Sequence, residues 1–417
     1  MNDSNNAPVQ GCPVSALSDT YMLSNEELEA LYKTARAETP VTYLNNIGYW
    51  AITKFDDIKA VLGDKEKFSA EITMDPLVPL PVEVRQLLEN RGFNPLPKLS
   101  CNEGPDHALI RKHTQAAFTP GRFNKLEPFI RQLVNDAVDS FEADKRADIV
   151  KQMVYELPAL VLFKIVGVPE EDVAKVKRWA DSRLLLTFGK QSLENQLLAA
   201  QDLADFWHYC RDLVDQRVKA PQDDLPSDML AQSVSEDGEI TIENIKNVLF
   251  GLLLAGHETT TNQSANAILT LLQHRESWEA IVADPDLIPN AVEECIRFRP
   301  PVVGWRRLAK CEVELSGVKI PAGEKLLCFL PSGNRDEAHV ENGEAFDIYR
   351  KDSRSHISFG FGRHFCLGAP LARFELKIIL EELTKRLPGL RLATGQDFQA
   401  VEAVQFRGPK ELWVEWD

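Results

Sequence analysis

Residues 358–375 read SFGFGRHFCLGAPLARFE and place one cysteine, Cys366, between a glycine-rich loop and the start of a predicted helix. Glycine lets a backbone adopt positive φ angles and approach a large flat ligand closely. Cys366 comes just before the predicted helix, where unpaired N–H groups and the positive end of the helix dipole favour a thiolate over a thiol. A buried free cysteine after a glycine turn is the alternative that this stretch alone leaves open.

The overall composition is that of a globular protein with a sizeable core. The 417 residues are 44% hydrophobic and 26% charged, which are ordinary proportions for a folded chain. The formal charge of −16 argues against a main surface that meets nucleic acid, because phosphate binding needs an excess of Lys and Arg. The seven cysteines include no Cys-x-x-Cys pair, so the sequence gives no sign of a zinc site.

The sequence predicts neither a membrane span nor an export signal. The longest apolar run, residues 248–256, is far shorter than the roughly twenty residues that cross a bilayer. Residues 1–20 are polar and lack the charged and apolar regions of a signal peptide, so we expect a flexible N-terminal leader. We therefore expect a cytoplasmic protein with no membrane partner and no nucleic-acid partner.

Hydrophobic periodicity predicts mostly helices, with a few short strands. Helices are expected at residues 25–36, 55–62, 82–91 and 371–386, and almost continuously over residues 107–274. A hairpin is expected around the turn at residues 45–48, and strands at residues 313–315, 318–320 and 325–330. The predicted fold class is mainly α with a small β region.

The segment FGFGRHFCLG resembles the haem-binding signature of the cytochrome P-450 family. The residues on the fixed positions of that signature are Phe359, Gly362, His364, Cys366 and Gly368. The resemblance implies haem b as the cofactor, with the Cys366 thiolate as the axial ligand that donates electron density to iron. It also implies the cytochrome P-450 fold, with residues 21–417 as a single haem domain.

A second pair of residues occupies positions that the family uses for structure. Glu294 and Arg297 lie at i and i+3 on one predicted helical face, where they can form an ion pair. By itself such a pair would most often be solvated. Because Pro300-Pro301 follows it, as in the family, the resemblance implies a buried structural network.

A haem carries two propionates, so a haem protein needs basic donors that converge on one edge of the group. His107 and Arg111 lie at i and i+4 on one predicted helical face and match the family's H-x-x-x-R. Arg307 and His356 match two further propionate ligands of the family. Arg306 is a second candidate for the position given to Arg307.

The predicted helix that contains Ala255 is apolar on all sides and then abruptly polar, which is typical of a buried central helix. Its end resembles the family's A-G-x-[DE]-T motif. The resemblance implies that Ala255 and Gly256 leave room for dioxygen beside the haem. It implies that Thr259 hydrogen-bonds the oxygen being activated and that Glu258 helps deliver protons. His257 falls at the variable position, where we expect a hydrogen-bonded helix histidine rather than a ligand.

The resemblance implies a monooxygenase that converts R–H, O2, two electrons and two protons into R–OH and water. Hydroxylation, O-demethylation and epoxidation all follow from the same oxidant. The positions at which the family varies its substrate contacts are mainly apolar here, which suits a small hydrophobic substrate. The candidate pocket residues are Leu252, Ala255, Val302, Val303 and Trp305, with further walls at residues 72–97 and 184–197.

No recognisable flavin or iron–sulfur domain follows the haem region, so we expect a separate ferredoxin, or alternatively a flavodoxin, to supply electrons. Basic residues that the family's fold places around the thiolate would attract an acidic carrier. The expected docking residues are Lys112, Arg363, Arg373 and Lys377.

Two other functions compete with this interpretation. A peroxygenase of the same fold would use hydrogen peroxide, but it would normally lack the acid–alcohol pair Glu258-Thr259. A non-catalytic haem protein would bind a ligand or sense a gas, and the complete oxygen-activation motif argues against it. Consumption of oxygen that depends on a reduced carrier would separate the enzyme from the sensor.

Overall fold

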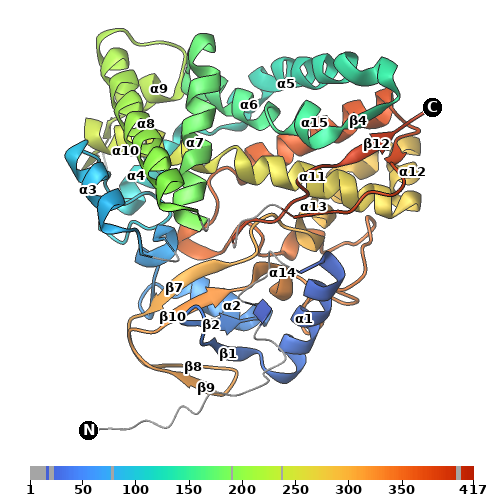
Figure 1. Ribbon diagram of the computed structural model, residues 1–417, viewed down its shortest axis with the longest axis horizontal. Helices are drawn as coiled ribbons and strands as arrows, with labels where there is room; N and C mark the ends of the chain where they lie inside the picture. Colours follow the sequence, from blue (N-terminus) through green and yellow to red (C-terminus); the bar gives the residue numbers. More distant parts are fainter. Residues whose placement is uncertain (1–15, 18–22, 77–78, 189–190, 236–237, 401–404) are drawn as a thin grey trace.

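The structure is a computed structural model that describes residues 16–17, 23–76, 79–188, 191–235, 238–400 and 405–417. Most of the helices gather on one side of the molecule, and a small sheet with the first two helices lies on the other (Figure 1). The fold class predicted from the sequence, mainly α with a small β region, is confirmed.

The helices are α1 Asn25–Glu38, α2 Phe55–Gly63, α3 Val82–Asn90, α4 His107–Ala117, α5 Pro120–Phe141, α6 Leu157–Val166, α7 Val173–Phe188, α8 Leu193–Lys219, α9 Leu225–Ala231, α10 Ile242–Ala255, α11 Glu258–Gln273, α12 Arg275–Ala283, α13 Ile288–Phe298, α14 Leu330–Gly333 and α15 Ala369–Arg386. A π-helix, η4, spans Val150–Val154. Short 3-10 turns are η2 Glu71–Met74, η3 Glu142–Asp144, η5 Glu170–Asp172, η6 Pro285–Leu287, η7 Ser353–Ser355 and η8 Gly362–His364.

The strands are β1 Val41–Leu44, β2 Tyr49–Ile52, β3 Phe68–Ser69, β4 Arg146–Asp148, β5 Val234–Ser235, β6 Gly238–Glu239, β7 Trp305–Ala309, β8 Val313–Leu315, β9 Val318–Ile320, β10 Lys325–Cys328, β11 Arg391–Leu392 and β12 Trp413–Glu415. The main sheet has the order β1-β2-β10-β7-β3. Its β2 and β10 are parallel, and its other neighbouring strands are antiparallel. The main sheet therefore joins strands from residues 41–69 with strands from residues 305–328.

The core consists of three groups of buried apolar side chains. The largest lies among the helices, the second between α2 and the main sheet, and the third beneath α1. Leu17 belongs to the third group and is 1% exposed, so this residue of the expected flexible leader is packed against the fold. Apart from Ala16 and Leu17, residues 1–20 lie outside the described residues.

The expected long helix around Ala255 is broken. α10 ends at Ala255 and α11 begins at Glu258, with Gly256 and His257 in a turn between them. The hydroxyl of Thr259 donates to the carbonyl of Ala255 at 3.1 Å, in place of the helical partner that this carbonyl would otherwise have. The apolar pattern continues across the break, and for that reason it predicts one helix.

No helix among the described residues has both the length and the apolar character needed to cross a membrane.

A buried ion pair joins α13 to the loop that precedes Cys366. Arg297 forms a two-pronged ion pair with Glu294, at 2.7 and 2.8 Å, and neither side chain is exposed. The remaining three N–H groups of Arg297 donate to the carbonyls of Asn334, Gly343 and Ala345, at 2.8–2.9 Å. All five donors of the guanidinium are therefore used, which is what allows its charge to be buried.

The Asn334 side chain carries this order on to the segment before Cys366. Its amide nitrogen donates to Ser358 Oγ at 2.7 Å, and its amide oxygen accepts the backbone N–H of Ile357 at 2.8 Å. The hydroxyl of Ser358 in turn donates to the carbonyl of Ile296 at 2.8 Å. The start of the cysteine loop is therefore held by α13 through hydrogen bonds.

Arg297→Met is expected to lower the free energy of unfolding by about 3–5 kcal/mol. The change leaves the buried carboxylate of Glu294 with the more distant Arg350, at 3.4 Å, as its cationic partner, and it removes the donors from three buried carbonyls. The matched control is Lys319→Met, which breaks an exposed ion pair with Glu312 and should cost about 0–1 kcal/mol. Urea unfolding followed by circular dichroism measures both. Equal losses in the two variants would contradict the structural role given to Arg297.

Candidate active site

The cysteine loop turns sharply at two glycines. Gly360 and Gly362 have φ angles of 76° and 71°, which are left-handed conformations that favour glycine. A Cβ on Gly362 would also lie only 3.0 Å from the carbonyl oxygen of Leu62, at the end of α2. The turn is closed by the backbone N–H of Cys366, which donates to the carbonyl of Phe359 at 2.9 Å. The loop thus holds Cys366 at the N-terminal end of α15.

Cys366 has accessible surface, and yet its side chain is surrounded by protein. The residue has exposed surface, but desolvation raises the pKa of its thiol. The N–H groups of Gly368 and Ala369 and the guanidinium of Arg111 lower that pKa without overcoming the desolvation. The helix terminus thus acts in the predicted direction but does not suffice. Both observations fit a sulfur that faces an internal space and needs a cation to remain a thiolate.

His107 presents a buried N–H donor that has no acceptor. Its Nδ1 accepts a hydrogen bond from Arg363 Nε at 3.0 Å, so in the neutral ring the proton is on Nε2. Burial lowers the pKa of His107 to about 4, and the ring is therefore neutral near pH 7. Nε2 makes no hydrogen bond of regular geometry within the described part of the chain, although the backbone of Leu99 lies close enough to raise the pKa of the ring. A carboxylate is the kind of group that such a donor would bind.

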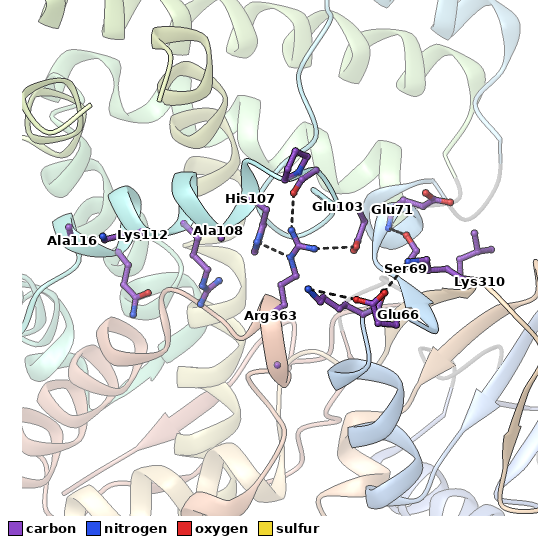
Figure 2. Close-up of a pocket in the computed structure, with 17 residues that line it drawn as sticks. Glu66, Ser69, Glu71, Glu103, His107, Ala108, Lys112, Ala116, Lys310 and Arg363 are labelled. Atoms are coloured by element: carbon purple, nitrogen blue, oxygen red, sulfur yellow. Dashed lines mark hydrogen bonds and ion pairs between the residues drawn. The ribbon is translucent and has the colours of Figure 1, made fainter. Parts of the chain in front are cut away.

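Other basic groups lie around His107. Figure 2 shows Arg363 reaching both His107 and Glu103, in a cavity of about 1210 Å³ that Arg111 also lines. Arg111 Nη2 donates to the carbonyl of Phe365 at 2.6 Å, immediately before Cys366. The structure therefore brings the predicted donors His107 and Arg111 to the cysteine loop.

His364 and Arg307 are already engaged by protein groups. The ring nitrogens of His364 lie 2.9 Å from the carbonyl of Leu99 and 3.2 Å from Glu103. Arg307 donates through Nη1 to Thr73 Oγ1 at 3.3 Å and to a neighbouring carbonyl. Arg307 nevertheless lies near this region. Its positive charge is the second largest cause, after burial, of the lowered pKa of His364. The competing candidate, Arg306, points elsewhere and donates to the carbonyls of Thr73 and Asp75.

Both ring nitrogens of His356 lie against protein groups, and its predicted contact with a propionate stays a prediction. Its Nε2 lies 3.3 Å from Glu293, and its Nδ1 accepts the backbone N–H of Ser358 at 3.2 Å. Glu293 also binds Arg373 at 2.7 Å. The position of His356 ahead of the loop is the same in either role, so spacing alone does not decide between them. Glu103 and Arg363 were missed as neighbours of His107, since no motif distinguishes them.

Gly256 and Ala255 at the helix break differ in the space around them. A Cβ on Gly256 would lie 2.7 Å from Leu162 Cδ2 on α6 and 3.1 Å from the carbonyl of Leu252, so a larger residue would displace the turn. Ala255 is exposed although Leu254 and His257 are buried. Ala255 thus has accessible surface although it belongs to a central helix. Thr259 and Glu258 follow at the start of α11.

The predicted pocket residues differ in how much surface they present. Leu252 and Ala255 have accessible surface on α10. Val302 and Trp305 are partly buried and pack against the second core group. Val303 is 3% exposed, so its side chain offers little to a ligand, contrary to the prediction. Of the further expected walls, residues 77–78 and 189–190 lie outside the described residues.

The sequence profile described as Cytochrome P450 matches residues 42–387. The chain belongs to the cytochrome P450 family. It is 35% identical to mycinamicin IV hydroxylase/epoxidase of Micromonospora griseorubida, over 88% of this chain and 89% of that protein. It is 33% identical to the biotin biosynthesis cytochrome P450 of Bacillus subtilis, over 87% and 90% of the two chains.

The solved structures agree with this assignment. Cytochrome P450 CREJ in complex with (4-ethylphenyl) dihydrogen phosphate superimposes with a TM-score of 0.89 and is 40% identical, over 93% of this chain and 96% of that one. Members of the family bind haem through a cysteine thiolate. The chain is therefore a haem-thiolate cytochrome P450 monooxygenase.

The residues of this chain fit a haem. The sulfur of Cys366 is accessible within an enclosed place, and such a sulfur suits an axial ligand. The unpaired Nε2–H of His107 and the guanidinium of Arg111 suit carboxylates at the edge of the same group. The unpaired donor is the more telling observation, because a buried N–H without an acceptor costs about 1–3 kcal/mol.

His107→Leu is expected to release haem roughly tenfold to a hundredfold faster, since a hydrogen bond to a charged group contributes about 1.5–3 kcal/mol. His356→Gln, which changes a histidine bound to Glu293, should release haem at the wild-type rate. Transfer of haem to an excess of apomyoglobin measures both rates. The opposite ranking would favour the predicted propionate contact of His356.

Proposed function

We propose that this cytochrome P450 inserts one atom of O2 into a small hydrophobic substrate, with electrons from a separate ferredoxin. The observation that carries the proposal is the broken central helix. There Ala255 has accessible surface, and Thr259 and Glu258 stand at the start of α11. An opening, an alcohol and a carboxylic acid at one helix break form a site that can hold a small molecule and move protons to it.

The proposed cofactor contacts follow the geometry. Cys366 would supply the sulfur ligand, and His107, Arg111 and Arg307 would donate hydrogen bonds to the carboxylates of the haem. Phe359, Gly362, His364 and Gly368 shape the loop that carries the sulfur. When bound, the haem supplies the oxidising chemistry that no side chain provides. We further propose that residues 21–417 form one haem domain.

The catalytic roles belong to two side chains of α11. Thr259 already donates its hydroxyl to the carbonyl of Ala255, which fixes the side chain on the inner side of the break. Glu258 Oε1 accepts from the Asn262 side chain at 3.1 Å, so that carboxylate has one fixed partner. We assign Glu258 the role of proton donor and Thr259 that of orienting the proton toward oxygen.

The proposed substrate class rests on the apolar character of the predicted pocket residues. Leu252, Ala255, Val302 and Trp305 present aliphatic and aromatic surface, which suits a hydrophobic compound. The relative with 40% identity was solved with (4-ethylphenyl) dihydrogen phosphate. Alkylphenyl phosphates are therefore a reasonable first set for a binding screen, alongside uncharged alkylphenols.

The expected docking face is more neutral than its sequence suggests. Arg363 contacts Glu103 at 3.6 Å, Arg373 contacts Glu293 at 2.7 Å and Lys377 contacts Glu381 at 2.8 Å. Lys112 is exposed on α4, one residue from Arg111. Lys65 and Lys310 line the same cavity and are exposed, although Lys65 contacts Glu66 at 3.8 Å. The exposed charges of Lys112 and Lys310 support the proposal of an acidic carrier such as a ferredoxin in the cytoplasm.

The reduced, carbon-monoxide-bound protein is expected to show a strongly red-shifted Soret band, which reports a thiolate opposite carbon monoxide. Cys366→Ser should abolish the shift. Cys311→Ser, at an exposed cysteine on the surface, should retain it. A shift that survives Cys366→Ser would overturn the assignment of the axial ligand.

Lys112→Glu is expected to slow reduction by a ferredoxin about fivefold at low salt, with a smaller effect at high salt because ions screen surface charges. Lys385→Glu makes the same charge change in the last turn of α15 and should leave the rate unaltered. Stopped-flow reduction measures the rate, and the affinity for substrate should be the same in both variants. Equal rates at low salt would rule out Lys112 as a docking residue.

A further inference from the structure

Three ionisable side chains meet at the break between α10 and α11. His257 lies in the break, Glu258 begins α11, and Asp181 comes from α7. One nitrogen or oxygen atom from each lies within 4.8 Å of those from the other two. Gaps of this size are closed either by a direct hydrogen bond or by one bridging water.

Asp181 connects this cluster to solvent. Its Oδ1 lies 3.4 Å from His257 Nε2, and its Oδ2 accepts the hydroxyl of Tyr155 at 2.7 Å. Tyr155 is 39% exposed and the Asp181 side chain 31%, whereas His257 is 1% exposed. Polar groups therefore run from the surface to a buried imidazole next to Glu258.

The second ring nitrogen of His257 has no protein partner. Nε2 donates to Asp181 in the neutral ring, which leaves the lone pair on Nδ1. Nδ1 is buried and makes no hydrogen bond with any described residue. Such an acceptor costs about 1–3 kcal/mol. A role in which Nδ1 carries a proton for part of the reaction cycle would account for a histidine at this buried position.

The charges around Asp181 favour its ionised form, so a proton that it takes up is passed on rather than kept. Burial raises the pKa of Asp181, but the hydrogen bond with His257 and the ammonium of Lys177 outweigh burial and hold the pKa below its usual range. Lys177 Nζ lies 3.7 Å from Asp181 Oδ1 and 3.5 Å from the centre of the Tyr155 ring. A buried ammonium at that distance disfavours a metal cation at the same cluster.

Two irregular backbone segments bring these groups together. Tyr155 follows the π-helix η4, where its N–H donates to the carbonyl of Val150 at 2.9 Å. His257 occupies the turn between α10 and α11. π-helical turns are uncommon in proteins and frequently mark functional sites. An unbroken α10–α11 helix would not hold His257 in this turn beside Asp181.

We propose that Asp181 and His257 form the proton path from solvent to Glu258. This inference rests on the proposed role of Glu258 as proton donor. Tyr155 and Lys177 position and balance the carboxylate of Asp181 at the outer end. His257 is a relay residue that acts through Glu258 and does not touch the substrate.

The steps conserve protons and charge. The neutral ring of His257 first moves its proton from Nε2 to Nδ1 by exchange with water. Asp181 then takes a proton from surface water and passes it to Nε2, while Nδ1 releases its proton toward Glu258. This transfer returns the ring to its first tautomer, with the proton on Nε2. Glu258 then gives its proton toward oxygen through the hydroxyl of Thr259. Each turnover repeats this twice, and the two electrons come from the carrier.

The contact between Asp181 and His257 is tested without turnover. In protein labelled with 15N-histidine, reduced and bound to carbon monoxide so that it is diamagnetic, one of eight histidine signals should vanish in His257→Gln and thereby be assigned. It should report a ring protonated on Nε2 and should shift in Asp181→Asn. The matched control is Asp202→Asn, which alters a carboxylate that binds Ser182 of α7 from α8. A signal that Asp181→Asn leaves in place would overturn the path.

The role in proton delivery is tested by turnover. His257→Gln and Asp181→Asn are each expected to slow oxygen consumption about tenfold, less than the roughly 100- to 10,000-fold effect of losing an acid–base group outright. The solvent deuterium isotope effect should rise, and a larger share of the oxygen should leave as hydrogen peroxide. Substrate affinity and melting temperature should match those of Asp202→Asn.

Glu258→Gln separates the failure of this inference from that of the proposed function. If Glu258→Gln slows turnover and raises the isotope effect while His257→Gln and Asp181→Asn do neither, the donor role stands and the path is wrong. If Glu258→Gln has no effect, the donor role itself is wrong, and the path loses its destination.

Discussion

The buried ion pair between Glu294 and Arg297 is the interaction on which the rest of the site depends. An arginine with no exposed surface is tolerated because each of its five N–H groups has an acceptor, and three of these acceptors are carbonyls of one loop. The same loop contains Asn334, which binds the backbone and side chain just ahead of the cysteine loop. The sulfur of Cys366 is therefore positioned from a charge pair in α13, a different segment of the chain. The Glu294–Arg297 pair and the cysteine loop, although far apart in sequence, are therefore parts of one hydrogen-bonded network.

The break in the central helix concentrates chemistry because it interrupts regular hydrogen bonding. A side chain at Gly256 would press on Leu162 and on the carbonyl of Leu252, so this turn favours glycine. The carbonyl of Ala255 accepts the hydroxyl of Thr259, and this exchange orients that hydroxyl. Polar residues elsewhere in α11 are buried as well, including Gln263 and Ser264, whose side-chain polar atoms have no protein partner in the described chain.

Local pattern predicted most helices, the hairpin of β1 and β2 and the strands β8, β9 and β10, because capping, periodicity and turn residues act over a few positions. Ser24 and Glu27 form a capping box at the start of α1, for example. Strand β7 was missed, since Arg306 and Arg307 spoil its alternation and are buried only through distant partners. The break at Gly256 was missed because apolar residues continue across it. Among the predicted site residues, His107 and Arg111 lie at the cysteine loop, whereas His356 lies against Glu293 of α13, which no spacing in the sequence could predict.

The parallel pairing of β2 with β10 has a consequence for how the chain folds on the ribosome. Trp50, on β2, donates to Glu324, 274 residues further along the chain. The hairpin of β1 and β2 is short, and two-stranded hairpins are only marginally stable alone. At about 5–20 residues per second, synthesis of the intervening chain takes on the order of tens of seconds. During that time the apolar face of the hairpin has no sheet to join. Newly made chains therefore expose an unpaired, apolar strand edge, which a chaperone would need to shield from other chains.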